Sequence, residues 1–285
     1  MTPSTLSRPD RADLAAALAA VVAGAPAPIG VAVRGDDGFT WEHDAQRVVP
    51  SASTIKVSIL VAVLRLVEEG RLHLDDRVAL PPVGERVGGA GALSLLHSVT
   101  ALPLVETLRL MVAVSDNDAT NAIVDHAGLL PRPAGGGRRA GHDPVGAVFA
   151  TVPMPHTRFE RRLMDLQAAA EGRDNRTCAA DLADLLVALR KGRLLGADLT
   201  TLAVELLRAQ PPREGLPAYL ADDVLVASKP GDLRGVRTEV ALLERRGRWA
   251  VVAVVAVGLV RGSADRGTAV LPIFAALGEL TATLL

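Results

Sequence analysis

The 285-residue sequence has little of what marks several large classes of protein. Cys178 is the only cysteine, so the chain can form no internal disulfide, and cysteine usage leaves its redox compartment open. Aromatic residues make up 2% of the chain, too few for the stacking platforms that bind single-stranded nucleic acids. Lys plus Arg number 31 and Asp plus Glu 32, a net charge of -1. Without an excess of positive charge, neither nucleic acid nor an anionic membrane is expected as a partner.

No apolar run is long enough to span a bilayer as a helix. The longest, WAVVAVVAVGLV at residues 249–260, has 12 residues, whereas a membrane-spanning helix needs about 20. Its valine content and the preceding turn, ERRGR, predict a buried strand instead. Hydrophobic residues make up 49% of the chain, enough to form the core of one large domain or of two interleaved domains.

A second apolar segment, LAAALAAVVAGAPAP at residues 14–28, has two interpretations. An apolar stretch followed by small residues, with two arginines ahead of it, resembles a weak signal peptide. The alternative is a first helix that is capped near Ser7 or Asp10 and ended by the prolines of APAP. Asp13 and the short distance to the next predicted strand favour the helix. We therefore expect a cytoplasmic protein.

Predicted strands lie near both ends of the chain, and predicted helices fill the middle. Strands are expected at residues 29–38, 40–50, 224–231, 236–247 and 248–260, and helices at 53–70, 104–114, 117–128, 177–192 and 267–285. This order indicates a sheet built from both termini with an inserted helical domain. We place the sheet domain at residues 1–50 and 215–285 and the helical domain at 51–214. The Gly-, Pro- and Arg-rich residues 131–144 predict a surface loop.

Ser53 and Lys56 stand at the start of the first helix of the middle region. Residues three apart share one face of a helix, so their side chains are expected to lie together. Exposed amides at a helix N-terminus can stabilise an oxyanion, and a lysine in an apolar setting can act as the base that a nucleophilic serine needs. Taken alone, the pair is better explained by a lysine that extends along a helix surface to reach water.

Two more motifs follow Ser53-x-x-Lys56 in a known order. Ser-Asp-Asn stands at residues 115–117 and Lys-Pro-Gly at 229–231. With these three motifs the chain resembles the class A β-lactamases and their relatives among the serine hydrolases and penicillin-binding proteins. The resemblance extends from the first strand to the last helix. It implies an α+β fold, in which an antiparallel sheet flanked by helices and an inserted all-helical domain hold the active site in the cleft between them.

The resemblance also implies catalytic roles for the matching residues. Ser53 would be the acylated nucleophile, and Lys56 its base or proton relay. Ser115 would pass a proton to the leaving nitrogen, and Lys229 would tune it electrostatically. Asp116 is expected to be a structural residue that makes hydrogen bonds at its turn.

Substrate-binding roles are implied for a second group of residues. Asn117 would bind the substrate amide, and the backbone amides of Ser53 and Asp232 would form the oxyanion hole beside Gly231. The family usually has a hydroxyl residue where Pro230 stands, which helps to hold a substrate carboxylate. Proline has no donor to offer there, and Arg237 is expected to replace it in part.

The segment that should carry the base for deacylation aligns in two ways. The family pattern Arg-x-Glu-x-x-Leu-Asn, anchored on Arg158, makes Glu160 the base and leaves Met164 where an asparagine should hold the water. In the second alignment, the segment TRFER at residues 157–161 is matched to the family's Thr-Arg-Leu-Asp-Arg. This alignment puts Leu163 at the glutamate position and makes Asp165 the nearest carboxylate. The second local match is closer. Glu160 is kept as the candidate base, and both alignments stay open.

Together these features predict a monomeric serine hydrolase that acts through an acyl-enzyme on a β-lactam or other activated amide. No metal or cofactor is expected, because the six histidines show no metal-ligand spacing. Because the two alignments leave the base for deacylation ambiguous, we expect deacylation to be weak. Two alternatives remain: a biosynthetic acyltransferase or cyclase that uses the same Ser-Lys site, and a binder of β-lactams or peptidoglycan fragments that stays acylated. Turnover would support an enzyme, whereas a stoichiometric burst would support a binder.

Overall fold

A five-stranded antiparallel sheet organises the computed structural model, which describes residues 10–130, 143–211, 214–259 and 268–285. In spatial order its strands are β2 (Thr40–His43), β1 (Ile29–Gly35), β9 (Arg248–Val257), β8 (Val236–Arg245) and β7 (Leu225–Leu233). Every neighbouring pair runs antiparallel. Segments from both ends of the chain therefore form one sheet, and the predicted α+β fold class is confirmed.

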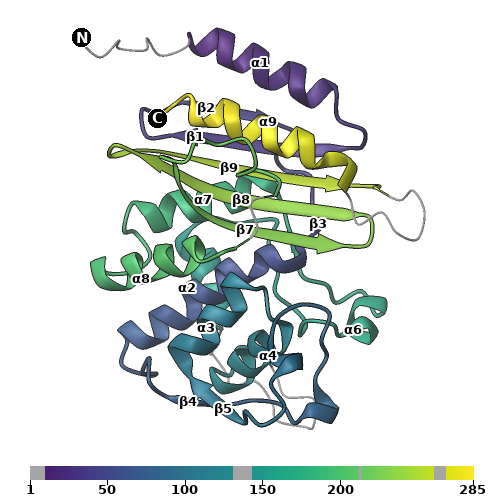
Figure 1. The fold of residues 1–285 in the computed structure, drawn as a ribbon, viewed down its shortest axis with the longest axis vertical. Coiled ribbons are helices and arrows are strands. Elements are labelled where there is room, and N and C mark those ends of the chain that lie inside the picture. Colours follow the sequence, from purple (N-terminus) through teal and green to yellow (C-terminus); the bar gives the residue numbers. More distant parts are fainter. Residues whose placement is uncertain (1–9, 131–142, 212–213, 260–267) are drawn as a thin grey trace.

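Helices cover both faces of this sheet (Figure 1). On one face lie α1 (Arg11–Ala23) and α9 (Leu271–Ala282). On the other face α7 (Ala179–Arg190) packs directly against β1, β8 and β9. On the same side α8 (Ala197–Arg208) packs against β7. Beyond these two helices lie α2 (Ile55–Glu68), α3 (Leu104–Ala113), α4 (Asn117–His126) and α6 (Leu166–Ala170), and α5 (Pro144–Thr151) packs against α2. Two short ribbons, β3 (Val49–Pro50) with β6 (Arg176–Thr177) and β4 (Arg77–Ala79) with β5 (Ala101–Pro103), complete this part.

The long apolar run forms the central strand β9, as predicted. Its side chains alternate between two cores, because successive residues of a strand point to opposite faces. Val251 and Val255 pack in the core shared with the helices around α2, whereas Val252 and Val254 pack under α1 and α9. A strand covered on both faces must be apolar at every position, which explains the run.

The N-terminal apolar segment forms the predicted helix, α1. The Asp10 carboxylate caps it by accepting a hydrogen bond from the Ala12 amide. Leu14, Leu18 and Val22 recur at four-residue spacing and are buried, so α1 packs on the sheet core through one stripe. Over the described part of the chain, no helix has both the length and the apolar character needed to cross a membrane.

Two predicted boundaries near the site are wrong. The strand expected over residues 40–50 ends at His43, because Asp44 adopts a left-handed backbone (φ 43°) and turns the chain. The later part of that segment pairs with β6 instead of continuing in the main sheet. The helix expected from Ser53 begins at Ile55, preceded by a 3-10 turn at Ala52–Thr54.

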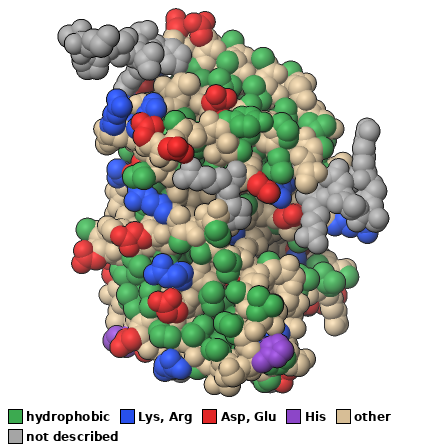
Figure 2. Space-filling model, viewed as in Figure 1, with side chains coloured by type: hydrophobic (Ala, Val, Ile, Leu, Met, Phe, Trp, Pro, Cys, Tyr) green, Lys and Arg blue, Asp and Glu red, His purple; other side chains and the backbone are tan. Residues whose placement is uncertain are grey.

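The sequence analysis also missed α5, α6 and α8. α8 is clearly amphipathic, with Ala203, Leu206 and Leu207 buried. Most of the loop predicted at residues 131–144 lies outside the described residues, and the domain boundaries at residues 50 and 214 stay a prediction. On the face shown in Figure 2, acidic and basic side chains are interspersed, in keeping with the near-zero net charge.

Candidate active site

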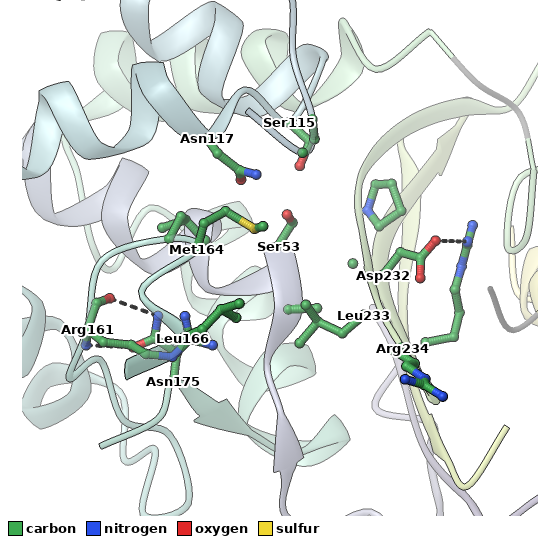
Figure 3. Close-up of a pocket in the computed structure, with 17 residues that line it drawn as sticks. Ser53, Ser115, Asn117, Arg161, Met164, Leu166, Asn175, Asp232, Leu233 and Arg234 are labelled. Atoms are coloured by element: carbon green, nitrogen blue, oxygen red, sulfur yellow. Dashed lines mark hydrogen bonds and ion pairs between the residues drawn. The ribbon is translucent and has the colours of Figure 1, made fainter. Parts of the chain in front are cut away.

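A cleft of about 530 Å³ opens between the C-terminal end of β7, the turn before α2, the start of α4 and the loop that leads into α6. This volume suits a small organic ligand. Figure 3 shows the Ser53 and Ser115 side chains facing one another in it, with Asn117 and Met164 on one side and Asp232 on the other. The cleft wall includes six of the predicted site residues: Ser53, Ser115, Asn117, Gly231, Asp232 and Arg237.

The turn that carries Ser53 is clamped against the sheet. Thr238 of β8 donates its hydroxyl to the Ser51 carbonyl (3.1 Å), which fixes the start of the turn. Gly231 of β7 lies so close that a Cβ there would stand 2.9 Å from the Ser53 nitrogen and 3.0 Å from Ala52 Cβ. Only glycine therefore lets the end of β7 approach the Ser53 amide, as an oxyanion hole built from both segments requires.

Lys56 is fully buried one turn after Ser53. Its Nζ donates to the Ser115 carbonyl (2.7 Å), the Ser115 hydroxyl (3.2 Å) and the Asn117 Oδ1 (2.9 Å). Burial lowers the pKa of the Lys56 ammonium well below its ordinary value of 10.5, the nearby charge of Lys229 lowers it further, and Asp116 opposes the shift. The lowered pKa shifts Lys56 towards the neutral amine, the form that a general base requires.

Backbone strain is concentrated at this cleft. Five non-glycine residues of the described chain have positive φ, and three of them line the cleft: Ala52 (48°), Ser115 (56°) and Met164 (62°). Such conformations cost of order 1–3 kcal/mol each and persist where the surrounding structure enforces them, most often at functional sites. At Ser115 the conformation accompanies a carbonyl oxygen that accepts from Lys56.

Asp116 holds the turn between the second motif and the preceding loop. Its Oδ1 accepts from the Ala119 amide and caps α4, while its Oδ2 accepts from the Ala92 and Leu93 amides. A Cβ on Gly91 (φ 108°) would stand 2.2 Å from this carboxylate, so glycine is required there. The expectation that Asp116 is structural agrees with these contacts.

Lys229 is also fully buried, behind the cleft wall. Its Nζ donates to the Pro230 carbonyl (2.9 Å). Burial lowers the pKa of Lys229 to about 7, Glu239 opposes the shift, and Arg237 adds to it. Since the charge of Lys229 lowers the pKa of Lys56, the two amines are electrostatically coupled, and protonating one disfavours protonating the other.

Glu239 is a buried carboxyl group on the α9 face of β8, opposite the face that carries Lys229. Its Oε2 accepts from the Leu216 amide (3.0 Å). Burial raises the pKa of Glu239 from 4.5 to about 7, against the lowering effects of that hydrogen bond and of the charges of Arg237 and Lys229. The folded protein therefore keeps this proton over a pH range in which the unfolded chain loses it.

Glu239→Gln should change how stability depends on pH. The folded state binds the extra proton between pH 4.5 and about 7, so the contribution of Glu239 is fully present below pH 4.5 and is lost as pH rises towards 7. At about 1.4 kcal/mol per pKa unit, wild type should lose roughly 3 kcal/mol relative to Glu239→Gln over this range. Urea unfolding at several pH values measures the difference. Glu205→Gln, at an exposed site on α8, is the matched control; parallel curves for wild type and Glu239→Gln would contradict the shift.

The loop before α6 is fixed by two polar clamps. Arg161 Nε lies 2.7 Å from Asp174 Oδ1, and Asn175 accepts from the Arg161 amide and donates to the Arg161 carbonyl. Asn121 of α4 holds both backbone groups of Leu163: its Oδ1 accepts from the Leu163 amide (2.9 Å), and its Nδ2 donates to the Leu163 carbonyl (3.1 Å). The Leu163 side chain, 8% exposed, thus forms part of the cleft wall.

Neither candidate base belongs to the cleft wall. Glu160 is exposed, and its charge acts on Arg173, outside the cleft. Asp165 caps α6 by accepting from the Ala168 amide (3.0 Å). The structure thus brings the other predicted site residues together but not Glu160, an arrangement that matches the alignment with Leu163 at the glutamate position.

Sequence reasoning missed the residues that clamp this loop. Asn121 stands four residues after Asn117, on the same face of α4, and this spacing was a signal that could have been used. For Arg234, which also lines the cleft, no local pattern separates it from an ordinary surface residue. Among the residues placed by the structure, no group of three or more His, Cys, Asp or Glu side chains could hold a metal ion.

Comparison with known protein families shows which family the chain belongs to. A model described as "Beta-lactamase enzyme family" matches residues 13–277. The chain belongs to this family. A β-lactamase of Rhodobacter capsulatus is 28% identical over 223 residues, which cover 74% of this chain and 68% of that protein.

Solved β-lactamases share the fold of this family member. The β-lactamase from Sphaerobacter thermophilus superposes with a TM-score of 0.81 at 27% identity, covering 96% of this chain and 98% of that one. An ancestral class A β-lactamase gives a TM-score of 0.80 at 24% identity, covering 95% of this chain and 100% of that one. The fold of this β-lactamase family member is therefore that of class A enzymes.

Proposed function

We propose that the protein is a serine hydrolase of the class A β-lactamase type, which attacks a β-lactam or another activated amide with Ser53 and releases the acyl group slowly. The observation that carries the proposal is the environment of Lys56. This lysine is buried one turn after Ser53, has a strongly lowered pKa, and contacts Ser115 and Asn117. Family membership supports the same chemistry.

Acylation begins when Ser53 Oγ attacks the carbonyl carbon of the amide and a new C–O bond forms. The serine proton passes to the neutral amine of Lys56, while the amides of Ser53 and Asp232 stabilise the oxyanion. As the C–N bond breaks, the proton moves from Lys56 through the Ser115 hydroxyl to the leaving nitrogen. The 3.2 Å contact between Lys56 Nζ and Ser115 Oγ supports this route.

Deacylation requires a base that takes a proton from water as the water attacks the ester. A well-placed base contributes a factor of roughly 100 to 10,000. Leu163 has no group that could accept a proton, Glu160 lies outside the cleft wall, and Asp165 is engaged as a helix cap. Hydrolysis of the acyl-enzyme is therefore slow compared with its formation.

Acyl transfer to an amine or alcohol is the second candidate function. One wall of the cleft is apolar and is formed by Leu163, Met164 and Leu166. Such a wall disfavours an ordered water but can bind an organic acceptor that brings its own nucleophile. A biosynthetic acyltransferase or cyclase would use the same Ser53 acyl-enzyme.

Intact-mass spectrometry after mixing with benzylpenicillin tests the proposal. Wild type should gain the mass of one penicillin, and Ser53→Ala should gain none, because Ser53 is the proposed nucleophile and lies in the cleft one turn before the buried Lys56. Ser98→Ala, at an exposed serine outside the cleft wall, is the matched control and should label like wild type.

The same samples separate the candidate functions. Equal labelling of Ser53→Ala and wild type would rule out the assigned nucleophile. Release of penicilloate at 10 per second or more, the typical rate of an enzyme, would contradict slow deacylation. Faster loss of the adduct on adding amines would support acyl transfer, and a permanent stoichiometric adduct would support a binder.

A further inference from the structure

The described wall of the cleft contains one carboxylate, that of Asp232. Asp232 follows Gly231 near the end of β7, next to the turn that carries Ser53. Its side chain is 36% exposed, so a bound molecule can reach it. A negative charge therefore lies beside the reacting centre, on the strand side of the cleft.

This carboxylate is paired with the arginine that would otherwise bind an anion. Asp232 and Arg237 are cross-strand partners in β7 and β8, and Asp232 Oδ2 lies 3.4 Å from Arg237 Nη1. In Figure 3 the dashed line from Asp232 runs away from Ser53. The Arg237 side chain is only 11% exposed, so the arginine is shielded from solvent while its partner Asp232 stays open to the cleft.

Apart from Arg237, the residues near the β7 side of the cleft do not provide a binding site for the carboxylate of a substrate. Pro230 has neither a hydroxyl nor an N–H to donate. Arg161 also lines the cleft, but it is bound to Asp174. Arg234 lies at the exposed rim, where water and salt screen its charge.

We propose that Asp232 is a specificity-determining residue that slows acylation by substrates carrying a carboxylate next to the scissile nitrogen, relative to substrates without one. An incoming carboxylate must either displace Asp232 from Arg237 Nη1 or share the guanidinium with it through Nε, which has no hydrogen-bond partner among the described residues. In both cases it lies beside a second negative charge, which opposes binding. The substrate class that fits is an amide, ester or lactam that is neutral, or carries an amine, on this side. This inference rests on the proposed function, since it concerns acylation of Ser53.

The test compares two probes that differ in one charge. Second-order rates of Ser53 acylation are measured by intact mass for benzylpenicillin and for its methyl ester, using the full chain. The readout is the ratio of the acid rate to the ester rate, which cancels any effect of a substitution on the Asp232 amide. Asp232→Asn should raise this ratio about tenfold or more, because it frees Arg237 and removes the repulsion. In a protein that already carries Arg237→Ala, Asp232→Asn should raise the acid-to-ester ratio by a smaller factor.

Asp198→Asn, which removes an exposed carboxylate from α8, controls for net charge and should leave the ratio at its wild-type value. A ratio that Asp232→Asn leaves within twofold of wild type overturns the specificity role while the proposed function stands, provided the ester labels Ser53. Absence of labelling by both probes overturns the proposed function and this inference with it. A lower ratio in Asp232→Asn would mean that Asp232 orients Arg237 for the carboxylate, the opposite of our proposal.

Discussion

Lys56→Met is expected to slow acylation of Ser53 by a factor of about 100 to 10,000. Methionine keeps the length of the buried side chain but cannot accept the Ser53 proton. It also removes the donor that contacts Ser115 and Asn117. Stopped-flow acylation with a chromogenic cephalosporin measures the rate, and intact mass shows whether the adduct still forms.

The pH profile separates a lost base from a lost structural contact. Lys56 acts as a base only as the neutral amine, so the wild-type rate should fall as pH drops through its lowered pKa. A variant without the amine should lack this fall, whatever its remaining rate. Lys191→Met, at an exposed lysine outside the cleft wall, should keep both the rate and the profile. If Lys56→Met acylates at the wild-type rate, the base is another group.

The position of Lys56 one turn after Ser53 could be predicted because it depends on local geometry. The helix begins at Ile55, but the 3-10 turn before it continues into it, so the three-residue spacing still corresponds to about one turn. The low pKa of Lys56 could not be predicted to the same degree. It arises from burial by several elements and from Lys229, which is distant in the sequence.

In the loop before α6, the sequence alone could not predict which side chain would face the cleft. Glu160 and Asp165 stand near the expected position in one alignment or the other, and local letters cannot choose between them. Which side chain faces the cleft depends on tertiary contacts. The chief ones are the hydrogen bonds between the Asn121 side chain and the Leu163 backbone, and the ion pair between Arg161 and Asp174. The pairing of Asp232 with Arg237 was missed for a similar reason, since it requires the register of β7 and β8.

Leu163→Glu should accelerate deacylation of the penicilloyl-enzyme by a factor of about 100 to 10,000, the largest gain we expect from one substitution. Asn121 holds the backbone at this position through both of its polar groups, so a new side chain should enter the cleft where Leu163 now lies. A carboxylate there can hold a water and take its proton. Partial burial will raise the pKa of the new carboxyl group, so the gain should be lost at low pH.

Single-turnover decay of the adduct, followed by intact mass, measures the deacylation rate. Leu163→Gln is the matched control: it has the same length and polarity but no basic group, and its decay should stay near that of wild type. Glu160→Gln and Asp165→Asn should also leave decay little changed, because neither carboxylate lines the cleft. If Glu160→Gln slows wild-type decay tenfold or more, the loop must rearrange in the acyl-enzyme, and the alignment anchored on Arg158 is correct. If Leu163→Glu and Leu163→Gln decay equally slowly, a missing base is not what limits hydrolysis, and the apolar wall beside Met164 becomes the cause to test.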